Sequence, residues 1–275
     1  MRKNTKIKKL KEQPLSLFER AEKHLQQNDA VYFWVIFAVT AIVAILLYDP
    51  RVSLTGDDSG YILGANGFIK DFRFPSSQAA LYMVALSPVT YFFGIALFPL
   101  KMFSMLSMIG FMYFTYIAFR RKIPACILFP ALALVSVNSY VLYYASQTYS
   151  EAFYMFMQSL FIYVFFRFAV KNKPENAGRG TEIKEYLLVA LAALGVALTR
   201  PIGISVIVAT AGYFLFYKEW KNMGLFLLSF VVLYFIYSLV QNRVWGGGGD
   251  LAPQMNNFLN KNPYPKKEPK TYQAC

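Results

Sequence analysis

The chain has 275 residues, of which 56% are apolar, 18% are aromatic and only 16% are charged, and its formal net charge is +13. Several nearly uncharged runs reach roughly 18 to 21 residues, enough for a helix to cross a hydrocarbon core about 30 Å thick. The basic residues are spread over short loops and form no single stripe, which argues against a nucleic-acid partner. We therefore expect an all-α polytopic membrane protein whose positive charges set its orientation.

Eight apolar segments are candidates for crossing the membrane. They lie at about residues 30–48, 79–98, 99–119, 123–144, 151–168, 186–198, 202–217 and 223–240. Cytoplasmic loops hold the excess of Lys and Arg, so these residues indicate how many segments cross. If all eight cross with the N-terminus inside, ten basic residues fall on the outer side: Arg120, Arg121, Lys122, Arg167, Lys171, Lys173, Arg179, Lys184, Lys218 and Lys221.

Eight crossings thus conflict with the usual cytoplasmic location of basic residues. The conflict disappears if the second segment, 79–98, lies along the outer interface or dips into the membrane and returns. All ten residues then fall inside. Apart from the C-terminal tail, the outer loops keep only Arg51, Lys70, Arg73, Lys101 and Arg200. Within the segment, Pro88 and Gly94 are local signs of a break. We expect about seven transmembrane helices, with juxtamembrane helices in the first extracytoplasmic loop.

The resulting organisation has three parts. Residues 1–29 form a basic cytoplasmic segment, residues 30–245 a transmembrane module, and residues 246–275 a polar extracytoplasmic tail. The tail is short enough that the sequence could be a fragment of a longer protein.

Two neighbouring carboxylates follow the first span directly. Asp57 and Asp58 would lie at the outer face, next to a helix on that face, which is where a membrane enzyme can keep a general base. Tyr61 comes four residues after Asp57 and therefore lies on the same side of such a helix. Plainer explanations remain open, because an acid here also caps a helix and a tyrosine is ordinary at a membrane interface.

Two further charged residues are expected at the same face. As one helix, residues 186–217 would be about 48 Å long, far more than the membrane requires, and Arg200-Pro201 stands at the middle. We expect a turn there, with Arg200 directed at a polar cavity, because a charge at that depth needs protein or water beside it. Glu151 opens the fifth segment at its outer end. The alternatives are that Arg200 reaches outer headgroups and that Glu151 only favours a helix start.

These features, in this order, resemble the GT-C superfamily of polytopic glycosyltransferases. The most similar branch contains the dolichyl-phosphate-mannose protein mannosyltransferases and the aminoarabinose transferases. The matching residues are Asp57-Asp58-Ser59-Gly60-Tyr61 for the family's Asp-Glu-x-x-Tyr, Ser150-Glu151-Ala152-Phe153 for its outer acidic segment, and Leu198-Thr199-Arg200-Pro201 for its basic turn. The resemblance covers roughly residues 30–245. The chain departs from the family at Asp58, where Glu is usual. Larger members continue with further spans or a soluble extracytoplasmic domain, whereas this sequence stops at Cys275.

The resemblance implies a glycosyltransferase that moves a sugar from a polyprenyl-phosphate carrier to an acceptor hydroxyl on the extracytoplasmic face. Asp57 would be the general base, and Arg200 would stabilise the departing lipid phosphate. Asp58 and Glu151 would orient the acceptor, hold Arg200 in place or bind a divalent cation, and Tyr61 would help shape the site. The expected location is a bacterial inner membrane with the site facing outward, and a eukaryotic secretory membrane is the second choice.

Two functions from other classes stay open. A transporter or flippase for a lipid-linked substrate would show broken segments repeated in two related halves, whereas the sequence has one broken region, around Arg200, and no clear repeat. The second alternative function is that of a membrane subunit without catalytic activity. The sugar and the acceptor are left open by the sequence.

The proposed topology predicts the location of a reporter fused after Lys122. Because segment 79–98 is expected not to cross, the reporter should read as cytoplasmic in a paired phosphatase and fluorescent-protein assay. An extracytoplasmic signal at that position would overturn the seven-span arrangement.

Overall fold

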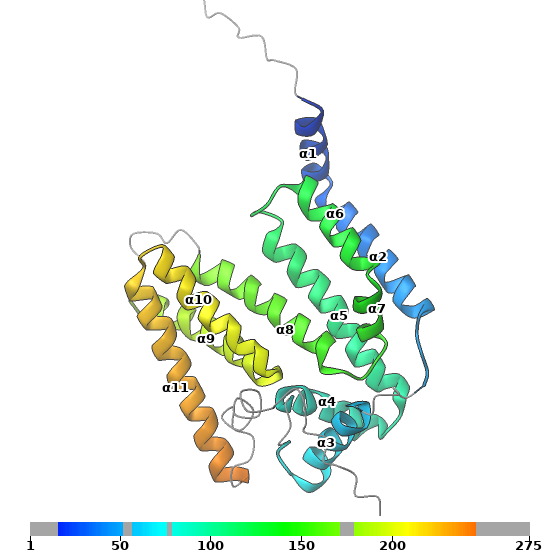
Figure 1. The fold of residues 1–275 in the computed structure, drawn as a ribbon, viewed down its shortest axis with the longest axis vertical. Helices are drawn as coiled ribbons and strands as arrows, with labels where there is room; N and C mark the ends of the chain where they lie inside the picture. The colour runs from blue at the N-terminus through cyan, green and yellow to red at the C-terminus, as the bar shows by residue number, and fades with distance from the viewer. Residues whose placement is uncertain (1–15, 52–56, 76–78, 171–178, 246–275) are drawn as a thin grey trace, which may run out of the picture.

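The computed structural model describes residues 16–51, 57–75, 79–170 and 179–245, and the side chains of 179–182 are not described. The regular elements in these ranges are all helical, so the predicted all-α class is confirmed for the described part of the chain (Figure 1). The expected tail at 246–275 and the first half of the basic segment lie outside the described residues.

The helices follow one another with short connections. Their bounds are α1 Leu17–Gln27, α2 Asp29–Leu46, α3 Asp57–Asp71, α4 Ala80–Phe93, α5 Leu97–Phe119, α6 Ala125–Ser136, α7 Ser139–Ala145, α8 Ser150–Val164, the π-helix η1 Phe165–Ala169, α9 Arg179–Thr199, the 3-10 helix η2 Pro201–Gly203, α10 Ile204–Phe216 and α11 Trp220–Trp245.

Four helical stretches of the described chain are long and apolar enough to cross a membrane: α2, α5, α8 with η1, and α11. The pair α6 and α7, bent by 59°, makes a fifth if it counts as one broken span. Helix α10 with η2 is apolar but shorter. The first turns of α9 carry Lys184 and Glu185, which reduce its hydropathy. Seven crossings therefore stay a prediction that depends on α9 and α10.

The helices alternate in direction, which separates the two ends of the bundle. In Figure 1, α2, α6, α9 and α11 run from the upper end to the lower end, and α5, α8 and α10 run back. The turns after α5 and after α10 therefore lie at the upper end with the start of α2. The starts of α3, α5, α8 and α10 lie at the lower end, so the expected basic turns and the expected charged site occupy opposite ends.

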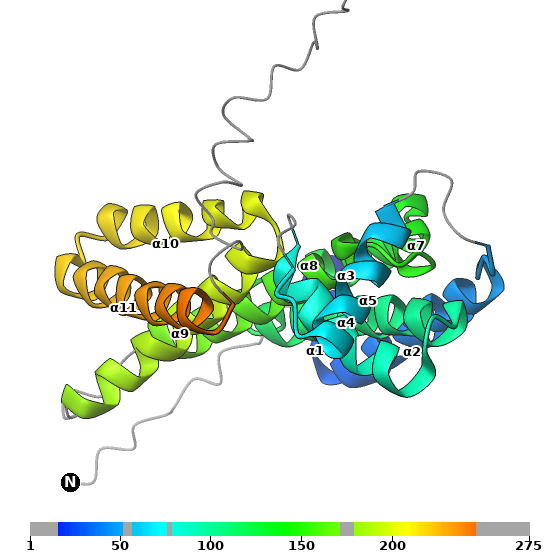
Figure 2. The ribbon, with the colours of Figure 1, turned by 90° about the horizontal axis from the view of Figure 1, so that it is seen from below.

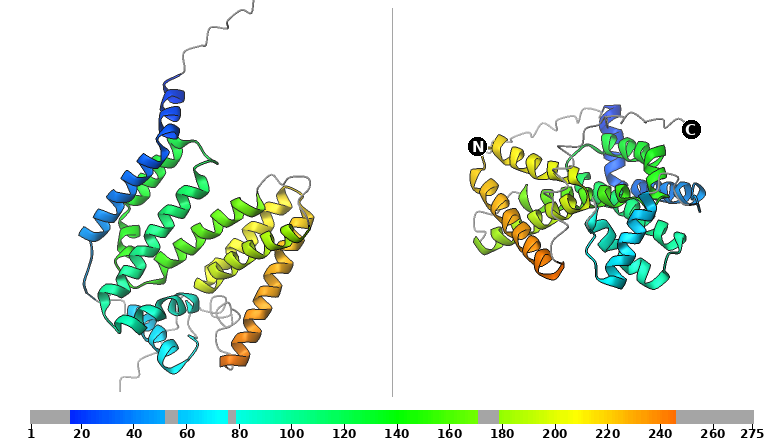
Figure 3. Two further views of the ribbon diagram at one scale, coloured as in Figure 1. Left: turned by 180° about the vertical axis from the view of Figure 1, so that it is seen from behind. Right: turned by 60° about the horizontal axis from the view of Figure 1, so that its bottom comes forward.

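Helices α3 and α4 lie across the lower end of the bundle rather than along it (Figures 1 and 3). With 14 residues, α4 is about 21 Å long, too short to cross a hydrocarbon core of about 30 Å. It ends at Gly94, whose φ of 63° is a left-handed conformation that glycine adopts without strain. The predicted segment 79–98 is thus broken at Gly94, and its last residues already belong to α5.

Two groups of helices are joined through α8 (Figure 2). On one side α2, α5 and α6 share a core that includes Phe33, Tyr116 and Phe129. On the other side α8 to α11 share a core with the fully buried Phe214 and Phe226. Close packing of α5 against α8 depends on Gly110, because a Cβ atom there would meet the Phe156 ring at 2.6 Å. The bundle therefore holds α5 and α8 side by side, and their ends form both surfaces discussed below.

The upper end of α6 is held by a carboxylate from another helix. Both oxygens of Glu22 in α1 accept hydrogen bonds, one from the backbone N–H of Ala125 and one from that of Cys126, each at 2.8 Å. These bonds satisfy donors that a helix start leaves without an intrahelical partner. They also hold the pKa of Glu22 below its usual value, with the bond from Cys126 contributing most. The short helix α1 is thereby fixed to the bundle.

Candidate active site

An ion pair joins two of the predicted site residues at the lower end of the bundle. Arg200 Nη1 lies 2.5 Å from Glu151 Oε1, and the two side chains are 34% and 28% exposed. Glu151 stands in the first turn of α8, and Arg200 stands at the break between α9 and η2. Two residues that are 49 positions apart in the chain are therefore in direct contact. This agrees with the expectation that both lie at the same face.

The turn that carries Arg200 follows from the residues on either side of it. Proline disfavours a helical conformation in the residue before it, and Arg200 is extended, with φ −152° and ψ 146°. Thr199 ends α9 and donates its hydroxyl to the Gly195 carbonyl oxygen at 2.8 Å. After the turn, Gly203 packs against the backbone of Val196, where a Cβ atom would collide. Close packing on both sides therefore directs Arg200 away from its own helix.

Tyr61 brings helix α3 to the same place. Its hydroxyl lies 3.3 Å from Ser150 Oγ, at the start of α8, and its ring meets the Tyr82 ring edge-on at 5.3 Å. Burial is the largest influence on Tyr61 and raises the pKa of its hydroxyl, while the contact with Ser150 lowers it. The carboxylate of Glu151 raises this pKa and Arg200 lowers it. Tyr61 is thus within electrostatic reach of the ion pair.

The two aspartates at the start of α3 face opposite ways. Asp57 is exposed, and its charge also reaches the Tyr61 hydroxyl. Asp58 is fully buried, and its charge acts on Tyr82 and Lys101. All five predicted site residues are therefore gathered around the starts of α3 and α8 and the α9–η2 turn. Of the two acids, Asp57 has the access to solvent that a group receiving a proton from an incoming molecule needs.

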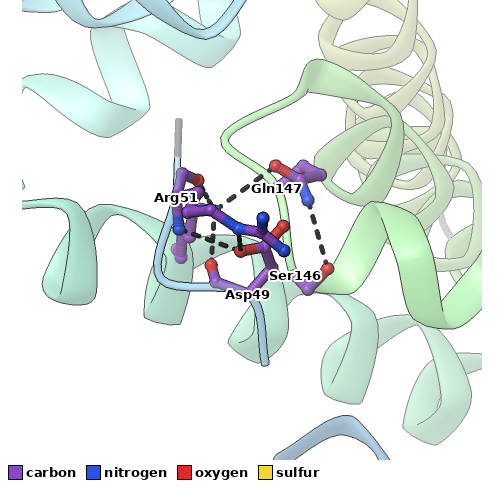
Figure 4. A network of polar contacts seen from close by, with 5 residues as sticks. Asp49, Arg51, Ser146 and Gln147 are labelled. Carbon is purple, nitrogen blue, oxygen red and sulfur yellow. Dashed lines mark hydrogen bonds and ion pairs between the residues drawn. The ribbon is translucent and has the colours of Figure 1, made fainter. Parts of the chain in front are cut away.

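Lys101 is a residue of this region that the sequence analysis placed wrongly. It was expected in an outer loop, but it lies in the first turns of α5 and is only 1% exposed. Its ammonium group donates to the carbonyl oxygens of Asp49 at 2.6 Å and Arg51 at 2.5 Å, and to Gln147 Oε1 at 3.3 Å (Figure 4). A lone lysine at the start of an apolar segment was the available signal, because an ionisable residue at membrane depth is costly unless it has partners.

The hydrogen bonds of Lys101 contribute more to stability than the ion pair beside them. Arg51 and Asp49 form a salt bridge at 3.2 Å, but the arginine side chain is 86% exposed, and such pairs contribute roughly 0–1 kcal/mol. A buried hydrogen bond to a charged group contributes about 1.5–3 kcal/mol. Lys101 therefore holds the chain leaving α2 against α5 and the α7–α8 turn. In the sequence, Asp57 follows six residues after Arg51.

An apolar cavity of 280 Å³ is lined mainly by residues of α4, α9 and α11, and neither Arg200 nor Glu151 is part of its lining. Its lining includes Leu198 of α9 together with Gln241 and Trp245 of α11. Gln241 is 1% exposed, and among the described residues neither atom of its amide has a hydrogen-bond partner. The amide atoms are themselves buried, so Gln241 contributes its apolar part to the wall of the cavity.

The metal prediction stays open. Within the described residues, the His, Cys, Asp and Glu side chains form no group of three that could hold a metal ion. A cation-binding role for Asp58 and Glu151 therefore stays a prediction. No protein-family model, curated protein or solved structure matches the chain, so the GT-C resemblance rests on the motifs alone.

Replacing Lys101 by Met should destabilise the protein, because two backbone carbonyls and the Gln147 side chain lose a charged donor. We expect a loss of about 1.5–3 kcal/mol in the free energy of unfolding, seen as a melting temperature several degrees lower in detergent. Lys70→Met, at an exposed position of α3, is the matched control and should melt like the unmodified protein. Equal melting of the two variants would show that Lys101 does not anchor the segment.

Proposed function

We propose that the chain is an integral-membrane glycosyltransferase that moves a sugar from a polyprenyl-phosphate carrier to an acceptor hydroxyl. The observation that carries the proposal is the Arg200–Glu151 ion pair, gathered with Tyr61 and Asp57 at one end of the bundle. A fixed guanidinium beside accessible carboxylates is the combination that this transfer needs, because one step both removes a proton and releases a phosphate.

The donor fits the surroundings of Arg200. One nitrogen of the guanidinium pairs with Glu151, and the side chain is one-third exposed, so its other donors remain available to phosphate oxygens. The 280 Å³ cavity is lined mainly by apolar and aromatic side chains, which suits the first isoprene units of the lipid. The accessible guanidinium of Arg200, and Leu198 two residues before it in the wall of this cavity, suit the two parts of a lipid-phosphate donor.

The transfer balances as a single displacement. The acceptor hydroxyl gives its proton to the Asp57 carboxylate while its oxygen bonds to the anomeric carbon. The bond between that carbon and the phosphate oxygen breaks, and its electron pair stays on the lipid phosphate. Arg200 stabilises this negative charge, and Glu151 holds the guanidinium in position. Tyr61 and Ser150 fix the start of α8, which carries Glu151.

The proposal includes seven crossings, with the site on the extracytoplasmic face of a bacterial inner membrane. Support comes from the alternating helix directions, which put the site at one end and the turns with Arg120, Arg121, Lys122 and Lys218 at the other (Figure 1). Cytoplasmic loops carry the excess of basic residues, so the end with these turns is the cytoplasmic one.

Asp57→Asn should abolish most of the transfer without affecting insertion into the membrane. Loss of a general base lowers rates by about 10²- to 10⁴-fold. The measurement incubates membranes holding the protein with labelled polyprenyl-phosphate sugars and follows the label into the acceptor fraction. Asp71→Asn, an exposed acid at the other end of α3, is the matched control and should transfer normally. Unchanged transfer by Asp57→Asn would remove this residue from the mechanism.

Arg200→Ala should weaken use of the lipid-phosphate donor in the same assay. A preorganised charge at a developing oxyanion is worth about 10²- to 10³-fold in rate, so we expect a loss of that size. Arg200→Lys should recover only part of it, because lysine offers a point charge in place of a planar fork. Arg73→Ala, at an exposed position near the end of α3, is the control. Equal donor turnover in Arg200→Ala and the control would contradict the assignment.

A further inference from the structure

A second cavity lies at the end of the bundle opposite to the candidate active site. It has a volume of 590 Å³ and opens between the end of α5 and the end of α8 with η1. Four of its lining residues are basic: Arg120, Arg121, Lys122 and Arg167. We call this cavity the basic groove. Neither the sequence motifs nor the proposed transfer gives it a role.

The positive charge of the basic groove is not balanced by acidic residues in its described lining. Among the described residues that line it, none is Asp or Glu. Arg120 is partly engaged, because Asp29 and Tyr116 lie close to it on the α2 side. Lys122 lies over the Phe166 ring, with its nitrogen 5.6 Å from the ring centre. Within the described lining, Arg121, Lys122 and Arg167 therefore have no acid among them, an arrangement that attracts an anion.

A rare backbone feature forms one wall of the basic groove. Helix α8 widens into the π-helix η1, where the Val170 N–H bonds to the Phe165 carbonyl oxygen at 3.2 Å. Single turns of π-helix are rare and are found frequently at functional sites. Here the wider turn presents Arg167 and Phe166 to the groove while Phe165 and Ala169 stay buried in the core.

The remaining walls of the groove are aromatic and apolar. Tyr113 and Ile117 come from α5, and Tyr163 comes from α8. Both helices belong to stretches long and apolar enough to cross a membrane, and this wall lies near their ends, so we expect it close to the membrane surface. A groove with cations at its mouth and rings below has the same two-part character as a phospholipid, with a phosphate above its acyl chains.

We propose that the basic groove binds the headgroup of an anionic phospholipid from the cytoplasmic leaflet. The guanidinium groups of Arg121 and Arg167 bind the phosphate as planar forks, and Lys122 adds a point charge. Basic pockets between transmembrane helices on the cytoplasmic side are recognised sites for such headgroups. Basic residues that only set orientation have no reason to converge on one cavity. Lys184 and Lys218 lie at the same end outside it.

The test measures binding of phosphatidylglycerol with a labelled acyl chain to the full-length protein in a neutral detergent. Each basic residue near a lipid phosphate is worth about fivefold in affinity, so Arg121→Gln/Arg167→Gln should bind about twenty-five-fold more weakly. The control Lys184→Gln/Lys218→Gln removes the same charge from the same end and should stay within twofold of the unmodified protein. Labelled phosphatidylcholine should bind weakly to all three.

Three outcomes would overturn the proposal. An equal loss in both double variants would mean that general surface charge attracts the lipid. Equal binding of phosphatidylcholine would mean that the groove does not distinguish an anionic headgroup from a zwitterionic one. Displacement of the labelled lipid by an equal concentration of glycerol phosphate would identify a site for a soluble anion. If the double variant does not purify as a folded protein, Arg167→Gln alone, at an exposed position, should show the fivefold loss.

Discussion

The ion pair between Arg200 and Glu151 is the interaction on which the arrangement of the lower end depends. Both side chains keep roughly a third of their surface exposed, so each charge loses only part of its hydration, and the partner offsets that loss. Because one partner ends α9 and the other begins α8, the pair fixes the position of the α9–η2 turn relative to α8. Tyr61 then attaches α3 to the same point through Ser150.

Lys101 is a second charge held near the apolar bundle, and different partners stabilise it. Its charge is satisfied by backbone carbonyls and a glutamine amide, with the buried Asp58 within electrostatic reach. Two of the cations at the lower end thus have separate tasks: Arg200 is partly exposed, and Lys101 is enclosed and structural. This division explains how one end of an apolar bundle can hold several charges and still leave one of them accessible.

Much of this arrangement could be predicted from sequence, because it depends on local effects. Pro201 forces the extended conformation at Arg200, and alternation of helices brings Glu151 to the same end. Other features depend on packing between distant segments. Whether Asp57 or Asp58 faces inward is set by the rotation of α3 against α4. The burial of Lys101 required carbonyl groups that become available only when the chain after α2 folds back, and the π-turn at 165–169 has no composition signal.

The way in which Lys101 binds has an evolutionary consequence. Its two shortest bonds are to main-chain oxygens, which every amino acid supplies at positions 49 and 51. Side chains there can change without removing either bond. A chain that keeps Lys101 can therefore vary the surface around positions 49 and 51 without losing this attachment.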